Sequence, residues 1–491
     1  MAPPEWNFTQ SDNFFSPVLP TELVLKICEC LCLHCQLDCV VAAPSEELMA
    51  GLENQKALSC LSRCNRRLCS IAQPVLFHWF EDSTRSRDYT RPIGARRLKR
   101  FTLTIVRQPG LAGSVRALFL RAPVTEALDD PNFNPHQKLA RAISPGITQL
   151  FLHDLGIFGS DDELEPVGWP YGLPNLKFLV CPGTRLHKEV LLQHHIYQIQ
   201  TMLRRAPKLE VLIAPNCGCN SVAENEWYYS IQPWGVPFPR LKKLSVDGIG
   251  VRTLKNIISS CPVLEDLEYF HDHDDEVLDP DHHLGHVGAT LRRLCYSGTP
   301  YKRWVPEFNY NVVFNESLVQ WRTGVANVIE KTLPTKRGLS FARFSALEEL
   351  EIEQLLILPP VFLGSEDPGG QDFLSRLPPA VKHLRFGCIV FWPTILRGLM
   401  ALADNVNDPS KFPRLETVTL ELYIRCLREF GVQHLIDTFY ASRRRVQLRV
   451  FLVEEEVQNR AKGVHPPRPG QRRYPKQLLY DSRLTRLDIC A

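Results

Sequence analysis

The sequence lacks a hydrophobic run long enough to cross a bilayer, and its first residues, MAPPEWNFTQ, show no basic stretch followed by an apolar core. It also lacks an excess of charge of either sign, because 57 Lys and Arg stand against 54 Asp and Glu, a net charge of +3. No global field would attract nucleic acid or a membrane surface. These absences predict a soluble, intracellular protein, cytoplasmic or nuclear, with neither nucleic acid nor a membrane as partner.

The sequence also lacks the short motifs of several common chemistries. It contains no phosphate-binding loop of the Gly-x-x-x-x-Gly-Lys type, no dinucleotide fingerprint after a strand and no Gly-x-Ser-x-Gly elbow. What is present is ordinary for a folded protein, with 44% hydrophobic and 23% charged residues. We therefore expect a non-catalytic protein without a cofactor.

Cysteine is plentiful, with 16 residues, but no disulfide framework is expected, because such frameworks belong to small secreted domains. Zinc is suggested by a run of cysteines with His34 among them, namely Cys28, Cys30, Cys32, Cys35 and Cys39, in which Cys32 and Cys35 have the spacing of half a zinc site. Only Cys60 and Cys64 offer a second half, and packing within helices explains most of these thiols more simply. We predict reduced thiols and no bound metal.

A second group of potential metal ligands runs from His271 to Glu276 and continues at Asp281, His282 and His283. The group follows a predicted strand, where polar loops are common, and it matches no fixed ligand spacing. A solvated loop is the favoured interpretation. A metal-dependent enzyme that uses the loop from His271 to His283 is the alternative.

Two amphipathic helices are predicted near the N-terminus. The first begins at Leu19 with Pro20 in its first turn, and its apolar residues recur every four positions on one face. The second is expected from 57 to 72 and is stopped by Pro74. Residues 38–56 between the helices are predicted to form an inserted loop or a short extra helix.

These segments resemble the F-box of fungal proteins. The resemblance is carried by Leu19-Pro20-x-Glu22-Leu23, by Arg66-Arg67-Leu68 and by the closing string from Ile71 to His78, IAQPVLFH. It implies binding to a Skp-type adaptor, which attaches the chain to a cullin–RING scaffold. The pool of candidate adaptor-binding residues consists of Leu19, Pro20, Leu23, Ile27, Leu31, Leu58, Leu61 and Leu68.

A short phrase with aliphatic residues at its first and fourth positions recurs about every thirty residues after position 95. Each phrase predicts a strand, and intervening segments such as 251–260 predict helices. The phrases end at Leu118, Leu150, Leu179, Leu212, Leu244, Leu267, Leu294, Leu350, Leu384 and Val418. One degenerate repeat is expected near 318–321.

A strand and a helix repeating at this period are typical of leucine-rich repeats, in which stacked units complete one core. The predicted fold class is α/β, an N-terminal helical F-box followed by an irregular leucine-rich-repeat-like solenoid, or horseshoe. The expected limits are a flexible N-terminus at 1–18, an F-box-like module at 19–80, the solenoid at 95–453, and an acidic, then Pro/Arg-rich, tail at 454–491.

In a repeat of this kind, the residues between the inward aliphatics face the concave side. The later strands are acidic in sequence. Solvated strand residues are the favoured interpretation, and a surface for a basic protein segment is the alternative. The candidate substrate-binding residues are Asp266, Glu268, Phe270, Glu349, Glu351 and Glu353.

The predicted function is substrate recognition for a Skp–cullin–F-box ubiquitin ligase. The F-box would bind the adaptor and the repeats would bind an unknown protein substrate. An interaction scaffold that does not promote ubiquitin transfer is the alternative of the same general class.

Overall fold

The structure is a computed structural model. It describes residues 19–37, 45–81, 93–120, 135–152, 171–181, 200–215, 235–247, 249–271, 278–298, 339–357, 370–389, 392–406, 408, 411–423, 432–441, 446–453 and 476–481. None of the helices within these ranges is both long enough and apolar enough to cross a membrane.

The chain divides into two compact units. The first contains residues 1–184 and 197–212, and the second contains 185–196 and 213–491. The predicted limits of the helical module, repeat region and tail are not tested by this division and stay predictions. Residues 1–18 and 318–321, for which a flexible end and a degenerate repeat are predicted, lie outside the described ranges.

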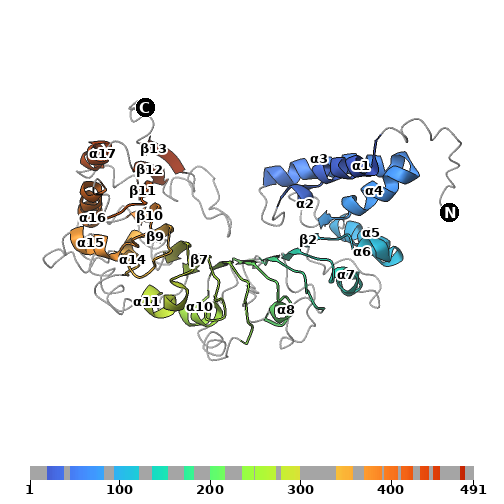
Figure 1. The fold of residues 1–491 in the computed structure, drawn as a ribbon, viewed down its shortest axis with the longest axis horizontal. Helices are drawn as coiled ribbons and strands as arrows, with labels where there is room; N and C mark the ends of the chain where they lie inside the picture. The colour runs from blue at the N-terminus through green and yellow to red at the C-terminus, as the bar shows by residue number, and fades with distance from the viewer. Residues whose placement is uncertain are drawn as a thin grey trace, which may run out of the picture. The chain divides into compact units, whose positions relative to one another are not determined.

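The first unit begins with helices α1 (Thr21–Leu31), α2 (Leu33–Gln36), α3 (Ser45–Cys64) and α4 (Arg66–Leu76). Helix α1 packs against both α3 and α4, as Figure 1 shows. The insert, predicted as a loop or a short extra helix, is helical from Ser45, where α3 begins. The predicted continuous second helix is wrong: it is divided at Asn65, whose side chain accepts a hydrogen bond from the Leu68 backbone and starts α4. Pro74 does not stop α4 but lies within its last turn.

The rest of the first unit alternates strands and helices (Figure 1). Its strands lie side by side in chain order, from β1 to β5. The strands are β1 (Trp79–Glu81), β2 (Ala117–Leu120), β3 (Gln149–Leu152), β4 (Phe178–Val180) and β5 (Val211–Ala214), the last at the boundary of the units. The helices are α5 (Ile93–Arg107), α6 (Pro109–Ala112), α7 (Pro135–Ile143) and α8 (Gln200–Arg204).

The second unit continues the same alternation from β6 to β12, with parallel pairing between neighbouring strands. The strands are β6 (Lys243–Asp247), β7 (Asp266–His271), β8 (Arg293–Gly298), β9 (Glu349–Glu353), β10 (His383–Ile389), β11 (Thr417–Tyr423) and β12 (Gln447–Val453). The helical segments are α10 (Val251–Ile258), α11 (Pro280–His283), η4 (Gly285–Val287), α14 (Gln354–Ile357), α15 (Gly370–Arg376), α16 (Trp392–Asn405) and α17 (Val432–Ala441).

The sheet of the second unit ends with a strand that the sequence did not predict. Strand β13 (Lys476–Asp481) lies within the expected tail and pairs antiparallel with β12. It therefore adds a strand of opposite direction beside β12.

The final aliphatic residue of every phrase lies in a strand, so the predicted strand positions are confirmed. Because the strands pair in register, these residues form buried rows. In the second unit one row consists of Leu244, Leu267, Leu294, Leu350, Leu384, Val418 and Leu448, none of them more than 1% exposed.

The predicted solenoid is wrong. The finding that corrects it is an α/β arrangement of parallel strands in a sheet with interleaved helices. Parallel strands need crossover connections, which usually contain helices. Here the crossover helices range from 4 residues in α11 to 15 in α5, so the connections are not copies of one unit. The recurring phrase marks a strand and its buried face, but the same phrase suits any parallel sheet covered by helices.

Candidate functional site

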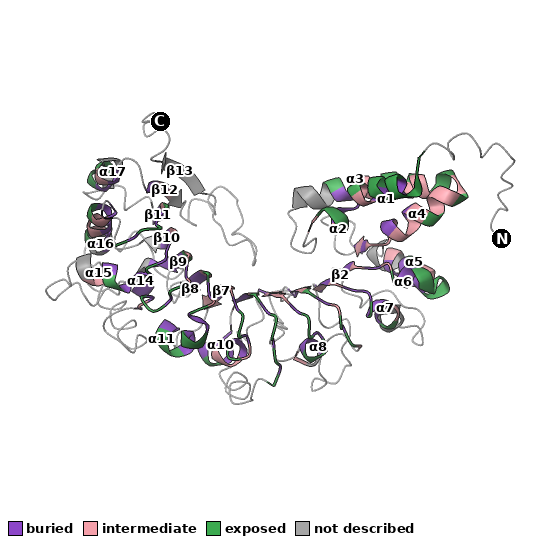
Figure 2. Cartoon of the chain, in the orientation of Figure 1, coloured by how far each residue is buried: buried purple, intermediate pink, exposed green. Residues whose placement is uncertain are grey.

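An exposed row of apolar side chains lies on α1. Leu19, just before the helix, is 45% exposed, Leu23 is 50% exposed and Ile27 is 45% exposed. Their spacing of four residues puts them on one helix face. Two other residues of the helix, Val24 and Cys28, are buried. Figure 2 shows buried and exposed residues along α1. The helix therefore has a core-facing stripe and a separate exposed apolar stripe.

The other candidate adaptor residues fall into different environments. Pro20 is exposed, whereas Leu31, Leu61 and Leu68 are half-buried. Leu58 is fully buried, so it packs the helices together and is not available to a partner. The docking prediction itself stays a prediction, and the available surface is centred on α1.

Arg67 fixes the start of α1 against α4. Its Nη2 donates to the Leu19 carbonyl at 2.7 Å and to Thr21 Oγ1 at 3.2 Å. A carbonyl and a hydroxyl at the beginning of α1 are thus held by a side chain of the neighbouring helix. This contact positions the end of the exposed row that contains Leu19 and Pro20.

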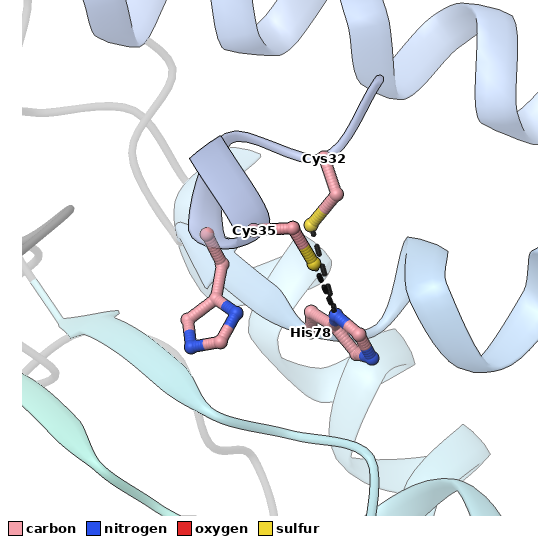
Figure 3. Close-up of side chains that lie close together, drawn as sticks. Cys32, Cys35 and His78 are labelled. Carbon is pink, nitrogen blue, oxygen red and sulfur yellow. Dashed lines mark hydrogen bonds between the residues drawn. The ribbon is translucent and has the colours of Figure 1, made fainter. Parts of the chain in front are cut away.

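A Cys/His cluster lies where α1 ends. The ligand atoms of Cys32, His34, Cys35 and His78 all lie within 4.8 Å of one another. Cys35 Sγ is 3.3 Å from His78 Nδ1, and Cys32 Sγ is 3.8 Å from the same nitrogen. Figure 3 shows both sulfur atoms directed at the His78 ring. It is the single group of this type found in the described ranges.

The cluster is built from α2 and from the connection between α4 and β1. Cys32 is the extended N-cap residue of α2, and His34 and Cys35 lie in that helix. His78 lies between α4 and β1, and its backbone carbonyl accepts hydrogen bonds from the backbone nitrogens of Arg116 and Ala117, both at 2.8 Å. The two halves of the cluster therefore join the helical region to the first pair of strands.

The two thiols of the cluster differ in acidity. A hydrogen bond from the Cys35 thiol lowers the pKa of Cys32, although burial acts in the opposite direction. The same hydrogen bond raises the pKa of Cys35. Cys32 is therefore the thiol that ionises first.

The sequence predicted no second half for the Cys32-x-x-Cys35 pair apart from Cys60 and Cys64. In the structure the cluster is completed by His34, which the sequence already placed among the cysteines, and by His78, which it did not suggest, while Cys60 and Cys64 lie outside the cluster. His78 is the last residue of the IAQPVLFH string, so a signal was present. Because His78 is 43 residues from Cys35 along the chain, the sequence did not show that the two lie together.

The loop from His271 to His283 is only partly described. Residues 272–277 and the His271 side chain lie outside the description. Among the rest, Asp279 caps α11 by accepting hydrogen bonds from the backbone of Asp281 and His282. His282 also lies 3.1 Å from Lys255 Nζ. The described part therefore has a structural explanation in helix capping.

The candidate substrate-binding residues lie on β7 and β9, where charges of both signs alternate across the strands. On β8, Arg293 Nη1 is 2.6 Å from Glu268 Oε1 and 3.0 Å from Asp266 Oδ1, and its Nε is 3.4 Å from Glu349. On β10, Arg385 Nε is 3.5 Å from Glu351 Oε1. The acidic surface expected from sequence is thus internally paired.

The remaining two candidates have local roles in the sheet. Phe270 is half-buried between Asp247 and Ser297 in the strand register. Glu353 is buried and accepts a hydrogen bond from Ser297. A cavity of about 450 Å³ is lined by residues in and next to β8 to β12. Its titratable lining residues are Arg293, Glu349, Glu351, His383, Arg385, Glu416 and Arg449.

The chain was compared with known proteins. No family model matches it, and no curated protein matches its sequence. The F-box assignment therefore stays a prediction from the residues quoted above.

Proposed function

We propose that this chain is the substrate-recognition subunit of a Skp–cullin–F-box type ubiquitin ligase. The observation that carries the proposal is the exposed row of Leu19, Leu23 and Ile27 on α1. Soluble proteins rarely leave large neighbouring apolar side chains on one surface unless that surface binds something. The row coincides with the part of the sequence that resembles the adaptor-binding helix of an F-box.

The exposed row is not needed to hold α1 in place. Val24 and Cys28 supply the buried stripe, and Arg67 holds the beginning of the helix. Burying a fully exposed Leu or Ile contributes about 1.5–3 kcal/mol, and because these side chains are about half exposed, a partner would gain about half of that from each. Three such residues on one face therefore offer a partner substantial binding energy without a cost to the fold.

The chain would act as a non-catalytic receptor in the cytoplasm or the nucleus. The adaptor would connect it to a cullin–RING scaffold, and the sheet surface would bind a protein substrate. Acceleration would come from holding the substrate close to the ubiquitin-loaded enzyme, which is catalysis by proximity.

The experiment is co-purification of the full-length chain with a Skp-type adaptor. The test variant carries Leu23→Asp and Ile27→Asp, both at exposed positions where a charge does not disturb the core. Val106→Asp is the matched control, because Val106 is 46% exposed on α5, away from α1. We expect binding by the parent and the control, and loss of binding in the double variant.

Two results would contradict the proposal. Failure of the folded parent chain to bind the adaptor removes the ligase function altogether. Binding of the adaptor by the double variant as strong as that by the parent chain would show that the docking surface is not the exposed row on α1. If binding holds, reconstituted ubiquitination of captured substrates separates a ligase receptor from an interaction scaffold.

A further inference from the structure

We propose that Cys32, His34, Cys35 and His78 bind one structural zinc ion. The ion would connect α2 to the chain that enters β1. This inference does not depend on the adaptor-binding function, because it concerns different residues.

The donor set fits zinc. Two thiolates and two imidazoles are a common structural zinc set, and a pair of cysteines separated by two residues usually supplies one half. Thiolate ligands disfavour magnesium and calcium, which prefer oxygen. The class of ligand is therefore a thiophilic divalent metal with tetrahedral preference.

The distances fit a tetrahedral site. With Zn–S bonds of about 2.3 Å and Zn–N bonds of about 2.1 Å, neighbouring sulfur and nitrogen ligands are about 3.6 Å apart. The Sγ to Nδ1 distances from Cys35 and Cys32 to His78 are 3.3 Å and 3.8 Å, on either side of this value. The largest separation in the whole set, 4.8 Å, can be closed by small rotations of side chains.

His34 provides an independent observation. Its Nδ1 is buried and has no hydrogen-bond partner among the described residues. Leaving a buried polar atom without a partner destabilises the fold. A metal ion bound by this nitrogen would remove the cost, and its ring already lies against that of His78, with centroids 5.5 Å apart.

The position of the cluster explains what an ion would stabilise. Helix α2 has only four residues and is too short to be stable alone. His78, by contrast, is fixed by the backbone hydrogen bonds that its carbonyl accepts from residues 116 and 117. A zinc ion would attach the short helix to this fixed point, as metals do in small domains whose folding depends on them.

The test is metal analysis of the full-length, untagged chain, purified under reducing conditions and supplied with zinc chloride before gel filtration. We expect about one zinc per chain in the parent. The Cys32→Ser, Cys35→Ser double variant should retain almost none. Cys30→Ser is the matched control, since Cys30 is an exposed cysteine close in sequence but outside the cluster, and it should bind like the parent.

A second measurement keeps the inference testable if the double variant does not fold. Cobalt added to the metal-free parent chain should give the visible absorption of tetrahedral Co²⁺ with thiolate ligands, and zinc should displace it. His34→Ala should weaken binding roughly tenfold or more. Unchanged binding in His34→Ala would overturn its assignment as a ligand. A folded parent chain that takes up neither metal would overturn the site and leave a hydrogen-bonded Cys/His cluster.

Discussion

Arg293 on β8 donates from Nη1 to Glu268 Oε1 on β7 at 2.6 Å, and the same nitrogen reaches Asp266. The Arg293 side chain is 30% exposed and that of Glu268 is 17% exposed. Burial alone disfavours the guanidinium charge, but the two carboxylates outweigh it and raise the pKa of Arg293. Lys243 on β6 lies on the other side of the same two carboxylates, with Nζ 2.9 Å from Asp266 and 3.3 Å from Glu268. Arg293 and Lys243 together therefore neutralise two acidic residues that would otherwise repel each other.

Replacement of Arg293 with Met should destabilise the second unit. The two carboxylates would lose a partly buried partner, and we expect the free energy of unfolding to fall by about 2 kcal/mol, between the values for exposed and buried pairs. Urea denaturation measures this loss. Arg343→Met is the control, because Arg343 is 82% exposed and 3.9 Å from its partner Asp281. Equal effects of both substitutions would contradict the importance of the pairing.

Asn65 should stabilise the start of α4 through its side chain. Asn65→Ala removes the acceptor for the Leu68 backbone nitrogen, 2.8 Å away, and should lower the free energy of unfolding by about 1 kcal/mol. Asn65→Asp keeps an oxygen at the same place and should cost much less. Thermal unfolding followed by circular dichroism compares the two, and an equal loss in both would show that the cap does not matter.

Truncation should affect stability at Leu58 and adaptor binding at Leu23. Leu58 is fully buried, so Leu58→Ala should lower the free energy of unfolding by about 3 kcal/mol. Leu23 is 50% exposed, so Leu23→Ala should change stability by less than about 0.5 kcal/mol. On the proposed function, Leu23→Ala should still weaken adaptor binding about tenfold. Denaturation and a binding titration give the two readouts, and a stability loss at Leu23 would place it in the core.

The parts of the fold that depend on local pattern could be predicted. The phrases ending at Leu244 and Leu267 predicted strands and buried positions, because alternation and turn residues are visible in a short window. The path between strands could not be predicted, because connections of different lengths suit the same phrase. The division at Asn65 was also hidden, since the apolar spacing of three and four residues continues across it.

Sites made by distant residues were harder to predict. Cys32 and Cys35 are neighbours in sequence, but His78 joins them only once α4 and β1 are in place. Similarly, Glu349 looked like part of an acidic run until the strand register put Arg293 directly opposite. Basic side chains on a neighbouring strand thus offset an acidic pattern that the sequence shows on one strand alone.

Gly398 should resist a substitution that is normally favourable. Alanine is a better helix former than glycine by about 1 kcal/mol. A Cβ at Gly398 in α16, however, would lie 2.8 Å from Cγ of Phe373, a buried ring that has little room to move. Overpacking of this kind costs about 1–3 kcal/mol, so Gly398→Ala should destabilise the chain. Gly285→Ala, where a Cβ meets nothing within 4 Å, is the control in a denaturation experiment, and stabilisation by Gly398→Ala would contradict the packing.

Cys261 should make stability depend on alkaline pH. It is fully buried, and burial raises the pKa of its thiol to about 12. Between about pH 9 and pH 12, the unfolded chain loses this proton while the folded chain keeps it, so this group stabilises less as the pH rises. The difference in free energy of unfolding between the parent and Cys261→Ala should therefore shrink by about 2 kcal/mol from about pH 8 to about pH 10.5. Cys30→Ala, at an exposed thiol, should show no such change, and a constant difference for Cys261→Ala would mean that the thiol ionises inside the fold as readily as outside it.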